Sequence, residues 1–294
     1  MVPAWSDIPI QVMISVFAVL NIIIDFGLLY LVFVSKSLPK SSNLTLFYFR
    51  FLIDGLFGVG TLLKSIPYFL DLFRVFQNPN QTFQVSLYLF SVDIALLRAF
   101  LVIIISLDRA TAVFFPVFYR TSRSSISNKF LIVLVLCWPI VDHAILWGVC
   151  EFRLGFETVC TVFNCHACPC FTRYTMVYEV AAHSIIVLIC LALAVKLFLW
   201  NWYKKDLKSK DIERANHLAL IDAALIFTFD IIPALLSIVF SLFSIVIFGL
   251  IPLCKVMGYT VEGYLVYCTL KRKCAVAGNG SMAASNLSSP VARI

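Results

Sequence analysis

Long apolar stretches are the feature that most restricts how this chain can fold. Seven of them follow one another, and each contains few charged residues. A helix of about 20 apolar residues is long enough to cross the hydrocarbon layer of a membrane. Lipid offers no partner to backbone polar groups, and none of the stretches alternates as a barrel strand does, so each must be helical. The sequence therefore predicts an all-α membrane protein, a bundle of seven transmembrane helices.

The predicted spans form one domain, residues 1–273, and residues 274–294 are predicted to be a short disordered tail because they are rich in small and polar residues. The first stretch is too long for a signal-peptide core and has no Lys or Arg before it, so it is expected to remain in the protein. The spans are Ile8–Val34, Leu44–Ile66, Val85–Leu107, Phe130–Val149, Tyr174–Trp200, Leu218–Phe240 and Ile245–Tyr267.

Basic residues predict the orientation of the bundle, because Lys and Arg are retained on the cytoplasmic side. The even-numbered connections carry only Arg74, Arg153 and Arg173. The odd-numbered connections and the tail carry Lys36, Lys40, Arg109, Arg120, Arg123, Lys129, Lys204, Lys205, Lys208, Lys210, Arg214, Lys271, Arg272, Lys273 and Arg293. This alternation places the N-terminus outside and the C-terminus in the cytosol. It also accounts for the net charge of +7 without a nucleic-acid partner, since the basic residues form no single stripe.

Glycosylation sequons and cysteines fit the same orientation. Of the sequons at Asn43, Asn80 and Asn286, only Asn80 falls outside, so it is the predicted glycosylation site. Half of the ten cysteines lie in the fourth connection, on the oxidising side, where disulfides form. Cys160, Cys165, Cys168 and Cys170 are the disulfide candidates, in any of three pairings, and Cys150 is expected to stay free at the end of its helix. A metal site around His166 is the less favoured reading of the cluster.

Ionisable residues inside the spans are costly in lipid and so suggest a function or a structural pairing. Arg50 and Asp54 are four residues apart and are expected to pair along one helix face. Five others fall in the predicted extracellular half: Asp93, Glu179, His183, Asp230 and Lys255. They either line one ligand cavity or pair with one another, for example Lys255 with Asp230, and the sequence favours neither. Pro233 frees a backbone carbonyl in mid-helix and is a candidate hinge.

The inner end of the third span reads Leu107-Asp108-Arg109, and this is similar to the acid-Arg motif of G-protein-coupled receptors. Three longer stretches, residues 107–120, 215–233 and 254–273, resemble those of the nematode serpentine chemoreceptors, class bc. The resemblance covers nearly the whole chain up to Lys273. It implies that Arg109 pairs with Asp108 at rest and is released to contact a heterotrimeric G protein, which makes Asp108, Arg109 and Pro233 the candidate signalling switch.

The resemblance further implies a chemosensory receptor that binds an extracellular small molecule within the helix bundle and acts from the plasma membrane of sensory neurons, in their cilia. No cofactor, metal or enzymatic activity is expected. Two features depart from the rhodopsin-like pattern. No cysteine precedes Cys137, so the usual disulfide at the top of the third span cannot form, and the seventh span lacks an Asn-Pro pair.

Other functions are less favoured by the same residues. Buried acids and lysines suit a secondary transporter or ion-coupled carrier, but the chain shows no internal repeat and no paired broken helices. A metal hydrolase would need histidines at ligand spacing, and the four histidines are scattered. Lys255 also allows a retinal Schiff base, although a lysine in an ion pair is more common in a membrane helix.

Overall fold

The computed structural model describes residues 7–36, 45–72, 81–123, 126–152, 159–160, 165–166, 169–203, 224–233 and 250–269. The predicted tail, the sequon residues Asn43, Asn80 and Asn286, and Cys168 lie outside these residues. The helices are α1 (Asp7–Phe33), α2 (Thr45–Leu72), α3 (Gln81–Phe114), α4 (Pro116–Arg123), α5 (Asn128–Leu136), α6 (Trp138–Ala144), η2 (Ile145–Val149), α7 (Pro169–Tyr203) and η3 (Phe227–Ile231). Residues 250–269 form a further helix.

Five helical segments of the described chain are long and apolar enough to cross a membrane: Ile8–Phe33, Thr45–Leu70, Thr82–Phe114, Asn128–Val149 and Pro169–Lys196. They overlap the first five predicted spans. The described part of the sixth predicted span, residues 224–233, is also helical. Residues 250–269, which include most of the seventh predicted span, are helical as well. The prediction of a helical membrane protein is confirmed in these residues.

The fourth span is built from three short pieces rather than one helix, and the sequence explains the break. Ser127 caps the start of α5 by accepting a hydrogen bond from the backbone N–H of Lys129 at 3.2 Å. Pro139 has no N–H to continue the helix and is favoured in the first turn of a new one. The chain therefore turns at Cys137 and restarts as α6, which brings Asp142 to a fully buried position.

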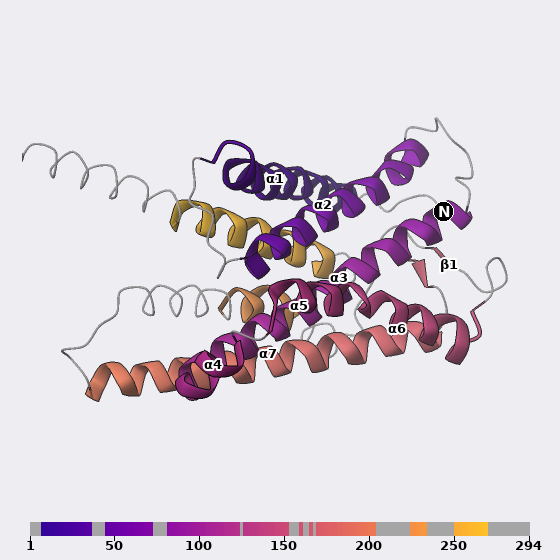
Figure 1. Cartoon of the computed structure of the whole chain (residues 1–294). Helices are drawn as coiled ribbons and strands as arrows, with labels where there is room; N and C mark the ends of the chain where they lie inside the picture. Colours follow the sequence, from indigo (N-terminus) through magenta and orange to yellow (C-terminus); the bar gives the residue numbers. More distant parts are fainter. Residues whose placement is uncertain are drawn as a thin grey trace, which may run out of the picture.

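Helix α3 is at the centre of the bundle and packs against α2, α4, α5, α6 and α7 (Figure 1). Its residues Leu97, Leu101 and Ile105 are buried against α2 and against Val135 of α5. A second cluster joins α1, α2 and the 250–269 helix through Ala18, Phe57, Val256 and Tyr259. The interior of α2 and α3 is thus enclosed from both sides, and this is where the buried charges lie.

One end of the bundle carries a disulfide between Cys150 and Cys170, whose Cα atoms are 5.6 Å apart; we call this the disulfide end. The expectation that Cys150 stays free is wrong. Leu146 and Phe152 on either side of Cys150 pack against Phe171 beside Cys170, so the packing brings these two cysteines together. The segment between them contains a small antiparallel pair, β1 (Val159–Cys160) and β2 (Cys165–His166), in which Cys160 is opposite Cys165.

Candidate functional site

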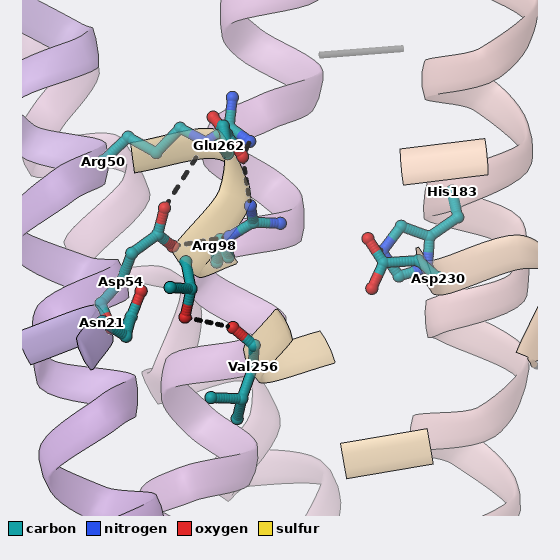
Figure 2. A network of polar contacts seen from close by, with 9 residues as sticks. Asn21, Arg50, Asp54, Arg98, His183, Asp230, Val256 and Glu262 are labelled. Atoms are coloured by element: carbon teal, nitrogen blue, oxygen red, sulfur yellow. Dashed lines mark hydrogen bonds and ion pairs between the residues drawn. The ribbon is translucent and has the colours of Figure 1, made fainter. Parts of the chain in front are cut away.

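A network of alternating charges occupies the middle of the bundle (Figure 2). Arg98 of α3 donates from Nε to Asp54 Oδ1 of α2 at 2.5 Å and from Nη2 to Glu262 Oε2 of the 250–269 helix at 2.9 Å. Arg50 of α2 contacts the same Glu262 oxygen and lies 3.8 Å from Asp54 Oδ2. Two guanidinium groups and two carboxylates therefore bind three helices to one another.

Burial makes this network, the central network hereafter, important for stability. The exposed fraction of its four side chains does not exceed 5%. Removing one member of a buried ion pair leaves an uncompensated charge at low dielectric, which is strongly destabilising. The expected pairing of Arg50 with Asp54 is confirmed, but it is one edge of a larger set. The sequence offered no sign that Arg98 and Glu262 complete it.

Close helix packing surrounds the central network. Asn21 of α1 donates from Nδ2 to the backbone carbonyl of Asp54 at 2.7 Å. The ring of Tyr259 stacks on the Arg98 guanidinium, with 3.6 Å between Cζ and the ring centroid. Gly263 lies directly against Asp25 of α1, because a Cβ at that glycine would be 2.6 Å from Asp25 Oδ1. Helix α1 is thus held against two of the helices that form the central network, α2 and the 250–269 helix.

Nearer the disulfide end, the predicted cavity residues form pairs rather than a single group. Lys255 Nζ contacts Glu179 Oε1 at 2.6 Å. His183 Nε2 lies 3.8 Å from Asp230 Oδ2, an ion pair only when the imidazole is protonated; Figure 2 shows these two side chains facing each other, apart from the central network. The example pairing of Lys255 with Asp230 is therefore wrong. Sequence position gives the depth of a residue but not the rotation of its helix, which selects the partner.

The fifth predicted cavity residue, Asp93, belongs to another contact. Its Oδ1 atom lies 3.8 Å from His143 Nδ1 of α6. Next to it, Tyr174 of α7 donates to Asp142 at 2.6 Å, and the ring of Trp138 stacks on Phe100. This acidic and aromatic group connects α3, α6 and α7. No motif in the sequence predicts the hydrogen bond between Tyr174 and Asp142.

Lys64 is a lysine of the bundle interior that is absent from the predicted site residues. Its position within the second predicted span is the feature of the sequence that could have identified it. Its Nζ atom lies over the ring of Tyr88 of α3, 5.7 Å from the ring centroid. The positive charge of Lys255 acts on Lys64 unfavourably. The disulfide-end half of the interior therefore holds two ammonium groups, of which Lys255 has a carboxylate partner.

The opposite end of the bundle, which carries α4, contains the acid-Arg motif. Arg123 of α4 donates to Asp108 Oδ1 at 2.7 Å, and the Tyr119 hydroxyl donates to Oδ2 at 3.2 Å. Burial, followed by the nearby charge of Asp108, raises the pKa of Tyr119. The guanidinium of Arg109 lies over the ring of Phe47, with 5.4 Å to the centroid. Arg123, which the charge pattern of the sequence assigns only to orientation, is thus a direct partner of Asp108.

Pro233 follows a local widening of its helix. The backbone N–H of Ile232 bonds to the carbonyl of Phe227, which closes the π-turn of η3. Such turns and prolines are the usual causes of a helix bend. Asp230 is within this turn and is buried, so a change in the turn would move the partner of His183.

Comparison with known proteins agrees with this geometry. The model of one protein family, described as the serpentine type 7TM GPCR chemoreceptor Srbc, matches residues 5–274. The match covers all the helices described above. No curated protein matches the chain.

Proposed function

Because this chain belongs to the serpentine-type seven-transmembrane chemoreceptor family Srbc, we propose that it is a chemosensory receptor that signals through a heterotrimeric G protein. In this proposal a small molecule binds among the helices near the disulfide end. The observation that carries the proposal is the family match across residues 5–274. It also favours a receptor over the transporter that the buried charges alone would suit.

The proposed orientation has the disulfide end outside the cell and the α4 end in the cytosol. Two observations support it: the excess of Lys and Arg in the connections at the α4 end, and the disulfide of Cys150 with Cys170 at the other end. In this orientation Asn80 is the sequon available to glycosylation. Loss of a glycan-dependent mobility shift in Asn80→Gln is expected, and a glycan on Asn43 would reverse the orientation.

The ligand region in this proposal contains Glu179, His183, Asp230 and Lys255. Their pairs connect α7 with η3 and with the 250–269 helix. A ligand that binds one arrangement of these helices better than another shifts the population between them. Asp93, with its partner His143, borders the region from α3.

The signalling region in this proposal is the α4 end. Asp108 is held by Arg123 and Tyr119, so α4 is attached to α3 by contacts that a shift of α3 would change. We propose that such a change, with Pro233 as the hinge, presents Arg109 to the G protein. The proposed place of action is the plasma membrane of sensory neurons, in their cilia.

The test is a ligand screen in cells that express the full chain with a G-protein reporter. A ligand-dependent signal is expected, and Arg109→Ala should abolish it while leaving surface expression unchanged. Arg173→Ala is the matched control, because Arg173 is an exposed arginine in the first turns of α7, at the other end of the bundle. An Arg109→Ala receptor that signals as well as wild type would contradict the assigned role.

A further inference from the structure

Lys64 differs from the other basic residues of the interior. It lies within the segment Thr45–Leu70, which is apolar enough to cross a membrane. None of the described carboxylates is within ion-pair distance of its ammonium group, whose contact is the face of Tyr88 at 5.7 Å. By contrast, carboxylates lie within 3 Å of Arg98 and Lys255. An ionisable group in a membrane helix is costly and is retained where it serves a function.

The described groups around Lys64 include no carboxylate that is available to pair with its ammonium group. Tyr88 approaches Lys64 from α3. One turn away along α2, Gly60 lets the two helices come close, since a Cβ there would be 3.2 Å from Ser91 Oγ. The charged group that acts on Lys64 is another cation, Lys255. The carboxylate on that side, Glu179, is already bound to Lys255 at 2.6 Å.

Two ammonium groups with one engaged carboxylate form a site that lacks an anion. A carboxylate entering from the disulfide end would form a charge-assisted hydrogen bond with Lys64 and weaken the repulsion between Lys64 and Lys255. An amine would meet two like charges instead. Asp230 does not change this balance, because it faces His183.

We propose that Lys64, supported by Lys255, recognises the anionic group of a small carboxylate ligand. The proposal rests on the proposed receptor function, because it names the chemical class of that receptor's ligand. The ammonium of Lys64 lies over the ring of Tyr88, so an aromatic side chain borders the proposed site.

Matched head groups test the proposal on the purified full chain in lipid nanodiscs. The midpoint of thermal unfolding is measured with acetate, hexanoate and benzoate, with the corresponding neutral amides, and with benzylammonium. At least one carboxylate should raise the midpoint in a concentration-dependent way, because a ligand that binds the folded state stabilises it. Its amide and benzylammonium should leave the midpoint unchanged.

Variants then locate the site. Lys64→Gln should weaken binding of the stabilising carboxylate at least tenfold, and Lys64→Met repeats the test if the first variant does not fold. Lys129→Gln is the matched control, because it removes the same charge from an exposed position in the first turn of α5; its binding should equal that of wild type.

Four results would overturn the proposal: no stabilisation by any of the carboxylates, equal stabilisation by their amides, carboxylate binding that persists in both Lys64 variants, or preferential stabilisation by benzylammonium. The last result would mean that the site selects a cation. None of these measurements involves a G protein. A receptor that signals but ignores carboxylates therefore contradicts only this inference, whereas a chain that binds carboxylates and never signals contradicts the receptor function.

Discussion

The central network and the charged groups nearer the disulfide end use the same residue types in opposite ways. In the central network, the two guanidiniums and two carboxylates contact one another directly and are almost fully buried. Nearer the disulfide end, the Glu179 side chain is 30% exposed, the His183 contact is long, and Lys64 contacts a ring instead of a carboxylate.

This difference separates charges that hold the fold from charges available to a ligand. In the buried network each charged group already faces a group of opposite charge, and losing one member is expensive. Nearer the disulfide end, Glu179 is partly exposed, so its pair with Lys255 can open at a smaller cost because water replaces the lost partner. The comparison therefore predicts a gradient of stability effects, large at the centre and small toward Lys64.

The largest effect is expected from Arg98→Leu. The substitution leaves Asp54 and Glu262 buried without the guanidinium that bonds to both, and should lower the free energy of unfolding by about 3–5 kcal/mol. The measurement is the unfolding midpoint and the yield of monodisperse protein in detergent. A loss below about 1 kcal/mol would show that water reaches the centre and that the contrast between the two regions is not real.

A smaller loss is expected where α1 packs on the network. In Gly263→Ala the new Cβ would be 2.6 Å from Asp25 Oδ1 and 3.0 Å from Ile24 Cγ2. Such overpacking should cost about 1–3 kcal/mol in the same unfolding assay. Gly27→Ala is the control on α1, because an added Cβ there would meet no atom of a described neighbouring helix within 4 Å. It should be neutral or slightly stabilising, and equal effects of the two variants would contradict the close packing.

Lys255→Met tests the intermediate case. Its ammonium is largely buried, but Glu179 is partly exposed and can be rehydrated once its partner is gone. The expected loss is about 1 kcal/mol, nearer to that of a surface pair than of a buried one. The ligand-dependent signal should be strongly reduced, although the free energy of unfolding changes little. A loss as large as that of Arg98→Leu would move this pair into the structural class.

The sequence predicts features that depend on one helix better than contacts that depend on two. The helices of the bundle were predictable because an apolar run of sufficient length has no other fold in lipid. The pair of Arg50 with Asp54 was predictable because residues four apart share a helix face. Contacts between helices depend on how each helix is rotated about its axis. That rotation is hard to infer from the sequence of a helix that is apolar on all sides, because few polar residues mark which face points inward. The sequence therefore places Glu262 within the seventh predicted span but does not identify it as the partner of Arg98.

Local packing explains two further contacts that the sequence does not predict, the disulfide of Cys150 and the ion pair of Arg123 with Asp108. Cys150 was excluded from the disulfide because it ends a helix, yet the contact of Leu146 with Phe171 brings it to Cys170. Arg123 looked like one basic residue among many at its end of the bundle, and its contact with Asp108 follows from the turn between α3 and α4. Both depend on tertiary contacts that no motif encodes.

Lys64→Met should have the smallest effect on stability and is the most direct test of the contrast. Because none of the described carboxylates loses a partner, the change in the free energy of unfolding should lie within about 0.5 kcal/mol of zero or be stabilising, as expected when an unpaired charge leaves a membrane helix. Arg50→Met, also in α2, removes the same charge from the central network and should cost about as much as Arg98→Leu. Both variants are compared with wild type by thermal unfolding in nanodiscs. If Lys64→Met is as damaging as Arg50→Met, Lys64 supports the fold, and the disulfide-end region loses the property that distinguishes it from the centre.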